Sequence, residues 1–192
     1  MPRRKEFDVE ITLDRAADVF WSKGYEGASI QDLLDQMELN RGSLYDTFGG
    51  KHELYLSVLE RYSEKYQKIF RVLEGTGSGK KAIRTVFLNS LDPANPPPGK
   101  SGCLVTNAMV EMAPHCQQTA ARLQRIMRRL EKAFETALHR AQDRGEVSPN
   151  RDIRALAHFL TVAFHGMRAV AWLMPGNTMI RNFVEVALSS VE

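Results

Sequence analysis

The sequence lacks long hydrophobic runs and has only two cysteines. Its longest unbroken apolar stretch is six residues, Ala169 to Met174, whereas a membrane-spanning helix needs about 20. The basic N-terminus around Arg3 is not followed by the apolar segment of a secretory signal peptide. These absences predict a cytoplasmic protein with no membrane partner, whose cysteines are free thiols.

Motifs of the common enzyme classes are also missing. There is no glycine-rich phosphate loop, no nucleophile elbow and no helix with the paired His and Glu of a zinc hydrolase. The cysteines and histidines, such as Cys116, His158 and His165, lack the tight spacing of metal ligands. We therefore expect neither an enzyme nor a protein that holds a metal or another cofactor.

Helical periodicity is present almost throughout, and no segment alternates as a strand does. Pro- and Gly-rich interruptions long enough for loops occur at 75–79 and 92–100. The pattern predicts an all-α fold of about nine helices. The expected helices cover residues 8–23, 29–37, 40–47, 51–73, 79–91, 102–113, 115–145, 151–174 and 178–190.

The N-terminal segment predicts three packed helices. Gly24 is a natural stop for the first helix, and Ser29 caps the second, with Asp32 completing an approximate capping box. Asn40 caps a third short helix that ends near Thr47. Two helices this short are not stable alone, so they must pack on the first helix. A short helix, a tight turn and a second short helix form the helix-turn-helix arrangement.

The third helix has a surface chemistry that suits DNA. Arg41 can reach a guanine edge or a phosphate, and Gly42 lets a backbone approach closely. Tyr45, Lys51 and His52 offer phosphate contacts. The free amides at the start of the second helix offer a further anion site.

Charge counts argue against a broad basic field over this segment. Residues 1–51 carry seven Lys/Arg and ten Asp/Glu, a net charge of −3, and the remainder carries +6. The acidic residues of the first helix, such as Asp14, lie mostly opposite its expected buried face, whereas cations lie at the N-terminal arm and near Arg41. Locally placed cations should therefore bind DNA, with a modest salt dependence.

An ordered set of residues between positions 8 and 58 resembles the TetR family of transcriptional regulators. The set comprises Gly24-Tyr25, Ala28-Ser29-Ile30, Ile30 to Leu34, Gly42-Ser43-Leu44-Tyr45, Phe48 and Lys51 to Leu54. The resemblance implies a homodimer that inserts its third helices into successive major grooves of a near-palindromic operator. It further implies repression that an unknown small-molecule effector relieves.

The resemblance also implies residue roles. Ser29, Tyr45 and Lys51 would contact phosphates, whereas Arg41, Gly42 and Ser43 would face bases. The full expected DNA-binding set is Arg4, Ser29, Asn40, Arg41, Gly42, Ser43, Tyr45, Thr47, Lys51 and His52. The turn departs from the family pattern, because Glu38 occupies the usual position of glycine, where positive φ costs about 1 kcal/mol.

The expected division of the chain is a helix-turn-helix domain at 1–51, a connecting helix at 51–73, and a ligand-binding and dimerisation domain at 74–192. The last two helices are apolar over wide arcs, which can exceed what the core of one chain needs. Pairing them with the same helices of a second subunit would bury the remaining apolar surface in a four-helix bundle. The alternative is that both helices face their own core. The expected interface is Leu156, Leu160, Phe164, Phe183, Val184, Ala187 and Leu188.

An apolar cavity with a few polar groups is expected in the C-terminal domain. Met and aromatic residues at helical spacing can equally form plain core, so that alternative stays open. The candidate ligand-binding residues are Phe87, Cys103, Asn107, Met109, Glu111, Met112, Phe164, His165, Met167, Arg168 and Trp172.

Two other functions remain as hypotheses. Cys103, if it lies near a cation such as Arg168, could serve as a reactive thiol that senses electrophiles or oxidants. A disulfide with Cys116 is not expected, because an intervening helix would separate the two residues by roughly 20 Å. The second hypothesis, of a different class, is a helical adaptor protein that does not bind DNA.

Overall fold

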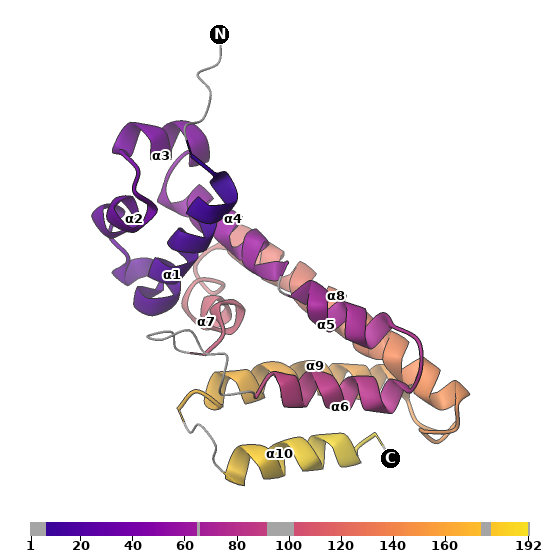
Figure 1. The fold of residues 1–192 in the computed structure, drawn as a ribbon. Coiled ribbons are helices and arrows are strands. Elements are labelled where there is room, and N and C mark those ends of the chain that lie inside the picture. The colour runs from indigo at the N-terminus through magenta and orange to yellow at the C-terminus, as the bar shows by residue number, and fades with distance from the viewer. Residues whose placement is uncertain (1–6, 65, 92–101, 174–177, 192) are drawn as a thin grey trace.

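The computed structural model describes residues 7–64, 66–91, 102–173 and 178–191. These residues form helices and no strand, so the predicted all-α fold is confirmed (Figure 1). The helices are α1 (Val9–Gly27), α2 (Ile30–Met37), α3 (Arg41–Phe48), α4 (Lys51–Ser63), α5 (Tyr66–Glu74), α6 (Gly79–Asn89), α7 (Leu104–Glu111), α8 (Gln117–Asp143), α9 (Ile153–Val170) and α10 (Thr178–Ser189).

One expected helix differs from the sequence prediction. The segment 51–73 is two helices, α4 and α5, on either side of residue 65, which lies outside the described residues. At the end of α4 the Glu64 N–H bonds to the carbonyl of Arg61 at 3.2 Å, three residues back. Bonds of this kind tighten the last turn of a helix.

Helices α1 to α4 form the N-terminal unit at one end of the molecule (Figure 1). α1 packs against α2 and α4, and α3 packs against α4. The core of this unit includes Phe20, Leu33, Leu44 and Tyr55, each no more than 1% exposed. The rings of Phe20 and Tyr55 meet edge to face with centroids 4.9 Å apart. A continuous core of this kind holds the short helices α2 and α3 in place.

The C-terminal helices are organised around the long helix α8, which runs beside α4 and α5 (Figure 1). α8 also packs against α6 and α9, and α10 covers α6 and α9. Phe87, Phe134 and Phe164 are fully buried where α6, α8 and α9 meet, with ring centroids 5.9 to 6.3 Å apart. α7 lies between the two units and contacts α1 and α4 on one side and α8 and α9 on the other.

Most residues expected at a dimer interface lie in the chain's own core, so this prediction was wrong for six of the seven. Those six are no more than 7% exposed: Leu156, Leu160, Phe164, Val184, Ala187 and Leu188. Phe183 alone is 37% exposed. The expected interface residues were chosen for their hydrophobicity, and most of them lie on the arc of each helix that packs inward. The outward arcs carry other apolar residues, namely Phe159, Val162 and Val170 on α9 and Met179, Phe183 and Val186 on α10.

In the parts of the chain that the structure describes, no helix has both the length and the apolarity needed to span a bilayer. Within the same residues, no three Cys, His, Asp or Glu side chains gather as a metal site would require.

Candidate nucleic-acid interface

The start of α2 is fixed by a capping box, as the sequence predicts. The Ser29 hydroxyl accepts a hydrogen bond from the Asp32 N–H, and the Asp32 carboxylate accepts one from the Ser29 N–H, both at 3.0 Å. Lys23 Nζ lies 2.6 Å from the same carboxylate. Hydrogen bonds from Lys23 and Ser29 lower the pKa of Asp32 to about 2. α2 therefore begins at a defined residue, with its first amides partly satisfied.

The turn between α2 and α3 has the left-handed backbone expected at Glu38. Its φ is 57° and its ψ is 41°, and it is the one non-glycine residue of positive φ among the described residues. The next residue, Leu39, donates its N–H to the carbonyl of Leu34 at 3.0 Å, which closes α2. Glu38 also forms an ion pair with Arg15 at 2.7 Å. The turn geometry therefore persists with glutamate in the place of glycine.

α3 lies on the surface as a short exposed rod. The Asn40 side chain accepts a hydrogen bond from the Ser43 N–H at 2.8 Å, which confirms the expected cap. Leu44 is the one buried residue of this helix. Phe48, at the end of the helix, is partly buried against the same core. Because Leu44 and Phe48 hold α3 to the core, its exposed positions can face solvent or a bound duplex.

The outward face of α3 carries most of the expected DNA contacts. Arg41, Gly42 and Tyr45 are exposed, and Ser43 and Thr47 are half-buried. Arg41 forms no ion pair with a described residue, so its guanidinium is not engaged by that part of the chain. Asp46 is exposed beside Tyr45 and was absent from the predicted set, although a carboxylate can accept a hydrogen bond from cytosine.

At the start of α4, the two residues expected to contact phosphates have different surroundings. Lys51 Nζ lies over the ring of Tyr25, 4.5 Å from its centroid. The His52 ring instead turns toward the C-terminal unit, where its Nε2 lies 3.1 Å from Cys116 Sγ. Hydrogen bonds from Thr119 and from His52 lower the pKa of Cys116 to about 7. His52 is therefore not a phosphate contact in this conformation. Arg4 lies outside the described residues.

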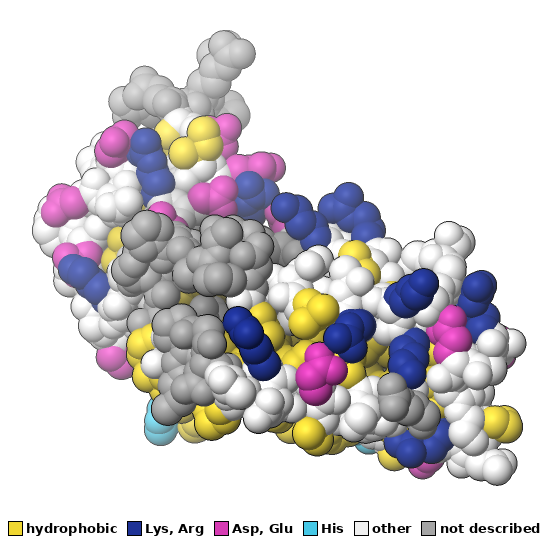
Figure 2. Space-filling view, turned by 60° about the horizontal axis from the view of Figure 1, so that its bottom comes forward, with side chains coloured by type: hydrophobic (Ala, Val, Ile, Leu, Met, Phe, Trp, Pro, Cys, Tyr) yellow, Lys and Arg dark blue, Asp and Glu magenta, His cyan; other side chains and the backbone are white. Residues whose placement is uncertain are grey.

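Internal ion pairs neutralise part of the acidic charge of the N-terminal segment. Arg61 on α4 pairs with both Glu10 and Asp14 of α1, each at 3.2 Å. Lys23 and Arg15 neutralise Asp32 and Glu38 as described above. Figure 2 shows acidic and basic side chains interspersed over this unit. On the face that Figure 2 shows, the negative net charge of residues 1–51 therefore does not form one continuous acidic patch.

Several expected ligand-binding residues instead form a buried polar cluster around Cys103. The thiol lies 3.6 Å from the Tyr66 hydroxyl and 3.9 Å from the Tyr62 hydroxyl. Burial raises the pKa of Cys103, but the charge of Arg168 and several hydrogen bonds outweigh burial and leave the pKa lowered. Burial also lowers the pKa of His165 to about 4, with Arg168 adding to the effect, so this imidazole is neutral at pH 7.

Other members of the expected pocket have structural roles. Phe87, Met112, Phe164 and Met167 are buried as core, whereas Trp172 is 46% exposed. Asn107 is half-buried near the backbone of Gly102. Glu111 does not line a cavity, because its carboxylate accepts hydrogen bonds from the N–H groups of Tyr25 and Glu26, both at 3.0 Å.

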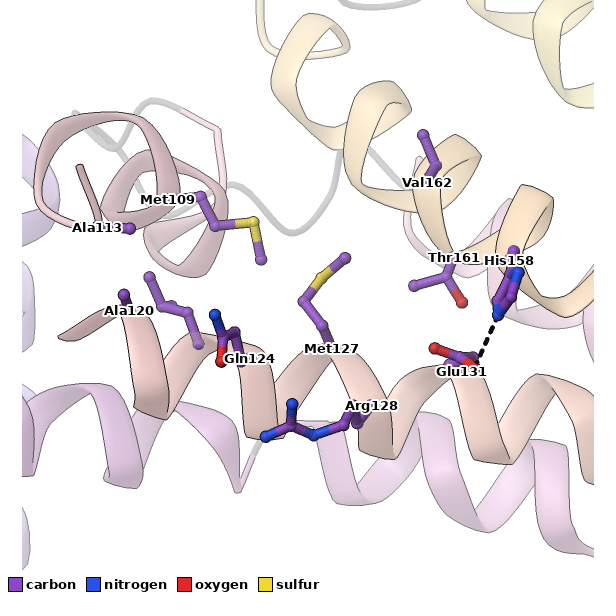
Figure 3. Close-up of a pocket in the computed structure, with 11 residues that line it drawn as sticks. Met109, Ala113, Ala120, Gln124, Met127, Arg128, Glu131, His158, Thr161 and Val162 are labelled. Atoms are coloured by element: carbon purple, nitrogen blue, oxygen red, sulfur yellow. Dashed lines mark hydrogen bonds and ion pairs between the residues drawn. The ribbon is translucent and has the colours of Figure 1, made fainter. Parts of the chain in front are cut away.

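A pocket of about 400 Å³ does exist, at a place that the sequence reasoning missed (Figure 3). It lies between α7, α8 and α9, and Met109 is the one predicted ligand-binding residue that lines it. Its α8 wall includes the buried Leu123 and the half-buried Met127, which lie four residues apart on one face of that helix. The four-residue spacing was visible in the sequence, but its orientation depends on the placement of α7 and α9.

Comparison with known proteins identifies the class to which this fold and surface belong. Residues 13–58 match the model of bacterial regulatory proteins of the tetR family. Residues 79–187 match the model of the tetracyclin repressor-like C-terminal domain. The chain therefore belongs to the TetR family of transcriptional regulators, a family of DNA-binding proteins rather than enzymes.

Individual relatives agree with this assignment over most or all of the chain. The chain is 37% identical to the uncharacterised regulator YezE of Bacillus subtilis, with 100% of both chains covered. It is 28% identical to the transcriptional repressor ComR of Escherichia coli, over 86% of this chain and 80% of that protein. Among solved structures, a cysteine mutant of the regulator CifR, complexed with 26-base-pair operator DNA, superimposes with a TM-score of 0.84. Its sequence identity is 27%, with 99% of this chain and 100% of that chain covered.

Proposed function

We propose that this chain is a repressor that binds a near-palindromic operator as a homodimer and leaves it when a small molecule occupies the C-terminal domain. In this proposal residues 1–51 bind DNA, 51–73 connect the two parts, and 74–192 dimerise and bind the effector. The observation that carries the proposal is α3, a capped and exposed helix held to the core by Leu44. The similarity to ComR, a repressor, and to CifR, which binds operator DNA, supports it.

Each expected contact on α3 has a chemical role in the proposal. Arg41 and Ser43 project hydrogen-bond donors from the first turn toward base edges, and Gly42 allows the backbone to approach them. Tyr45, together with Lys51 and the N-terminus of α2, binds the phosphates on either side of the groove. Phosphate contacts fix the register of the protein, while contacts to base edges select the sequence.

Dimerisation follows from the outward arcs of α9 and α10. Three exposed apolar residues lie on each arc: Phe159, Val162 and Val170, and Met179, Phe183 and Val186. Exposed apolar residues gathered on two helices that pack side by side favour a protein–protein contact. Pairing the two helices with their symmetry mates gives an intermolecular four-helix bundle, which would set the two copies of α3 about 34–36 Å apart, one turn of DNA.

The experiment begins by selecting duplexes from a random library with the purified full chain. Binding is then measured by fluorescence anisotropy for the wild type and for Tyr45→Ala, Arg41→Ala and Arg125→Ala. Arg125 is an exposed arginine on α8, away from α3, and serves as the matched control. Tyr45→Ala should weaken binding to all sequences, whereas Arg41→Ala should cost about 1–3 kcal/mol and relax the preference at one base pair. Failure of the wild type to enrich any sequence would favour the adaptor hypothesis.

A second candidate function rests on the cluster around Cys103. Its thiol has a lowered pKa, despite complete burial, because Arg168 and the neighbouring hydrogen-bond donors stabilise the thiolate. Thiolate character is what makes a cysteine reactive toward electrophiles and oxidants. In this version a quinone or hypochlorite modifies Cys103, disrupts its packing against Tyr62 and Tyr66, and releases the operator. A Cys103→Ser protein that still left its operator on exposure to these compounds would exclude it.

A further inference from the structure

The pocket in Figure 3 has the size and lining of a small-molecule site. Its volume of about 400 Å³ falls in the range of ligand pockets. Its apolar walls are Met109 and Ala113 from the α7 side, Ala120, Leu123 and Met127 from α8, and Val162 from α9. Val162 also belongs to the arc proposed to dimerise, so the pocket borders the proposed interface. The side chains of Met109 and Met127 project toward the space between their helices (Figure 3). Flexible methionines on two walls allow the pocket to fit an apolar body closely.

The polar groups of the pocket differ in whether they are already engaged. Glu131 and His158 are hydrogen-bonded to each other at 3.0 Å, and the Thr161 hydroxyl donates to the carbonyl of Ala157 at 2.8 Å. Gln124 and Arg128 are exposed, one turn apart on α8, and neither bonds to a described residue. Figure 3 shows the side chain of Arg128 extending along α8 in the direction of Gln124. The groups left for a ligand are therefore a guanidinium and an amide, which together suit a carboxylate or sulfonate.

The α7 wall of the pocket is attached directly to the DNA-binding unit. Glu111, the last residue of α7, lies between Met109 and Ala113 in the sequence. Its carboxylate accepts hydrogen bonds from the N–H groups of Tyr25 and Glu26 at the end of α1. A carboxylate bonded to two backbone amides is a charge-assisted contact, stronger than a neutral one.

The backbone of α1 is shaped to receive this carboxylate. Gly24 breaks the helix with a φ of 74° and a ψ of 176°, which frees the next two N–H groups from the helical ladder. A Cβ at Gly24 would lie 2.9 Å from Glu111 Oε1, so the position admits only glycine without displacement. α1 in turn packs on α2 and α4. A shift of α7 would therefore move the helix on which the DNA-binding unit is assembled.

We propose that this pocket is the effector site, that it takes a compact apolar molecule with one anionic group, and that α7 transmits its occupancy through Glu111 to α1. This inference rests on the proposed function, and it assigns the ligand class and the route of regulation. An apolar body between Met109 and Met127 displaces α7, and the carboxylate of Glu111 moves with it. The Tyr25 and Glu26 amides then lose their partner, and the population shifts away from the conformer that binds the operator.

Ligand binding is tested with two fluorescent probes of nearly the same shape, anionic anilinonaphthalene sulfonate and neutral N-phenylnaphthylamine. The wild type should bind the anionic probe more tightly, and Arg128→Gln should remove that preference while Arg125→Gln retains it. Met127→Trp fills the pocket and should abolish binding of both probes, with circular dichroism confirming that the variant is folded. Unchanged titrations of both probes with Arg128→Gln and with Met127→Trp would overturn the site.

Transmission is tested by operator anisotropy with and without the anionic probe. Saturating probe should weaken operator binding of the wild type by roughly 5- to 150-fold, the usual span of allosteric coupling. Glu111→Ala should bind the probe as the wild type does and lose most of that response, and Glu111→Gln, which keeps one acceptor oxygen, should lie between them. A Glu111→Ala protein with the full response would overturn the route but not the site. A wild type that binds no duplex, with or without probe, would refute the proposed function instead.

Discussion

Replacing Gly24 with alanine tests whether the junction between the two units depends on its unusual backbone. The residue lies at φ 74° and ψ 176°, a region that is almost exclusive to glycine and costs other residues about 1–3 kcal/mol. The added Cβ would also lie 2.9 Å from Glu111 Oε1 and displace that carboxylate from the Tyr25 and Glu26 amides. Hydrogen bonds to charged groups contribute about 1.5–3 kcal/mol, of which the flexible glutamate can recover part.

The combined destabilisation is therefore about 2–4 kcal/mol, which lowers Tm by roughly 4–16 °C for a chain of this length. The assay is thermal unfolding followed by circular dichroism, with all proteins at one concentration because a dimer's Tm depends on it. Gly27→Ala is the matched control, because a Cβ there meets only Lys23 Cβ at an ordinary 3.8 Å. If Gly24→Ala and Gly27→Ala melted together with the wild type, the reasoning about this junction would be refuted.

Three further predictions follow from single contacts. Asn40→Ala removes the cap of α3 and should cost about 1 kcal/mol in unfolding free energy, measured by urea denaturation; an unchanged midpoint would contradict the role of the cap. The rate at which Cys116 reacts with iodoacetamide should rise with pH, because the thiolate is the nucleophile, and reach half its maximum near pH 7. His52→Ala should move this midpoint to higher pH. A wild-type midpoint near pH 9 would show that the neighbouring hydrogen bonds do not lower the pKa of the thiol. Val186→Asp should be a monomer by light scattering, whereas the wild type should be a dimer. Val110→Asp changes an exposed valine on α7 and should remain a dimer. Equal masses for the two variants would exclude the α10 face as the dimer interface.

The N-terminal unit could be predicted from its sequence because its structure depends on local signals. The capping residues Ser29 and Asn40, and the break at Gly24, act within a few residues of their own position. The positive φ of Glu38 could also be anticipated, since this tight turn between two helices often needs one residue in the left-handed region. Where the backbone is fixed by contacts so close in sequence, residue types alone are informative.

The C-terminal half was less predictable because its surfaces are defined by tertiary packing. Leu160 and Val162 are both apolar and close in sequence on α9, yet one is fully buried and the other is 67% exposed. Periodicity identifies the helix but does not say which apolar arc meets its own chain and which meets a partner. His52 is a similar case, since its contact with Cys116 joins residues that are 64 positions apart. The pocket was missed for the same reason, because three separate helices form it.

The most direct test of the central claim, that α3 reads DNA as one half of a symmetric pair, is a hydroxyl-radical footprint on the selected duplex. The account predicts two protected patches on one face of the DNA, about 34–36 Å apart from centre to centre. The protection should be lost when Arg41 and Tyr45 are both replaced by alanine. A single continuous patch, or protection that survives the double replacement, would contradict it.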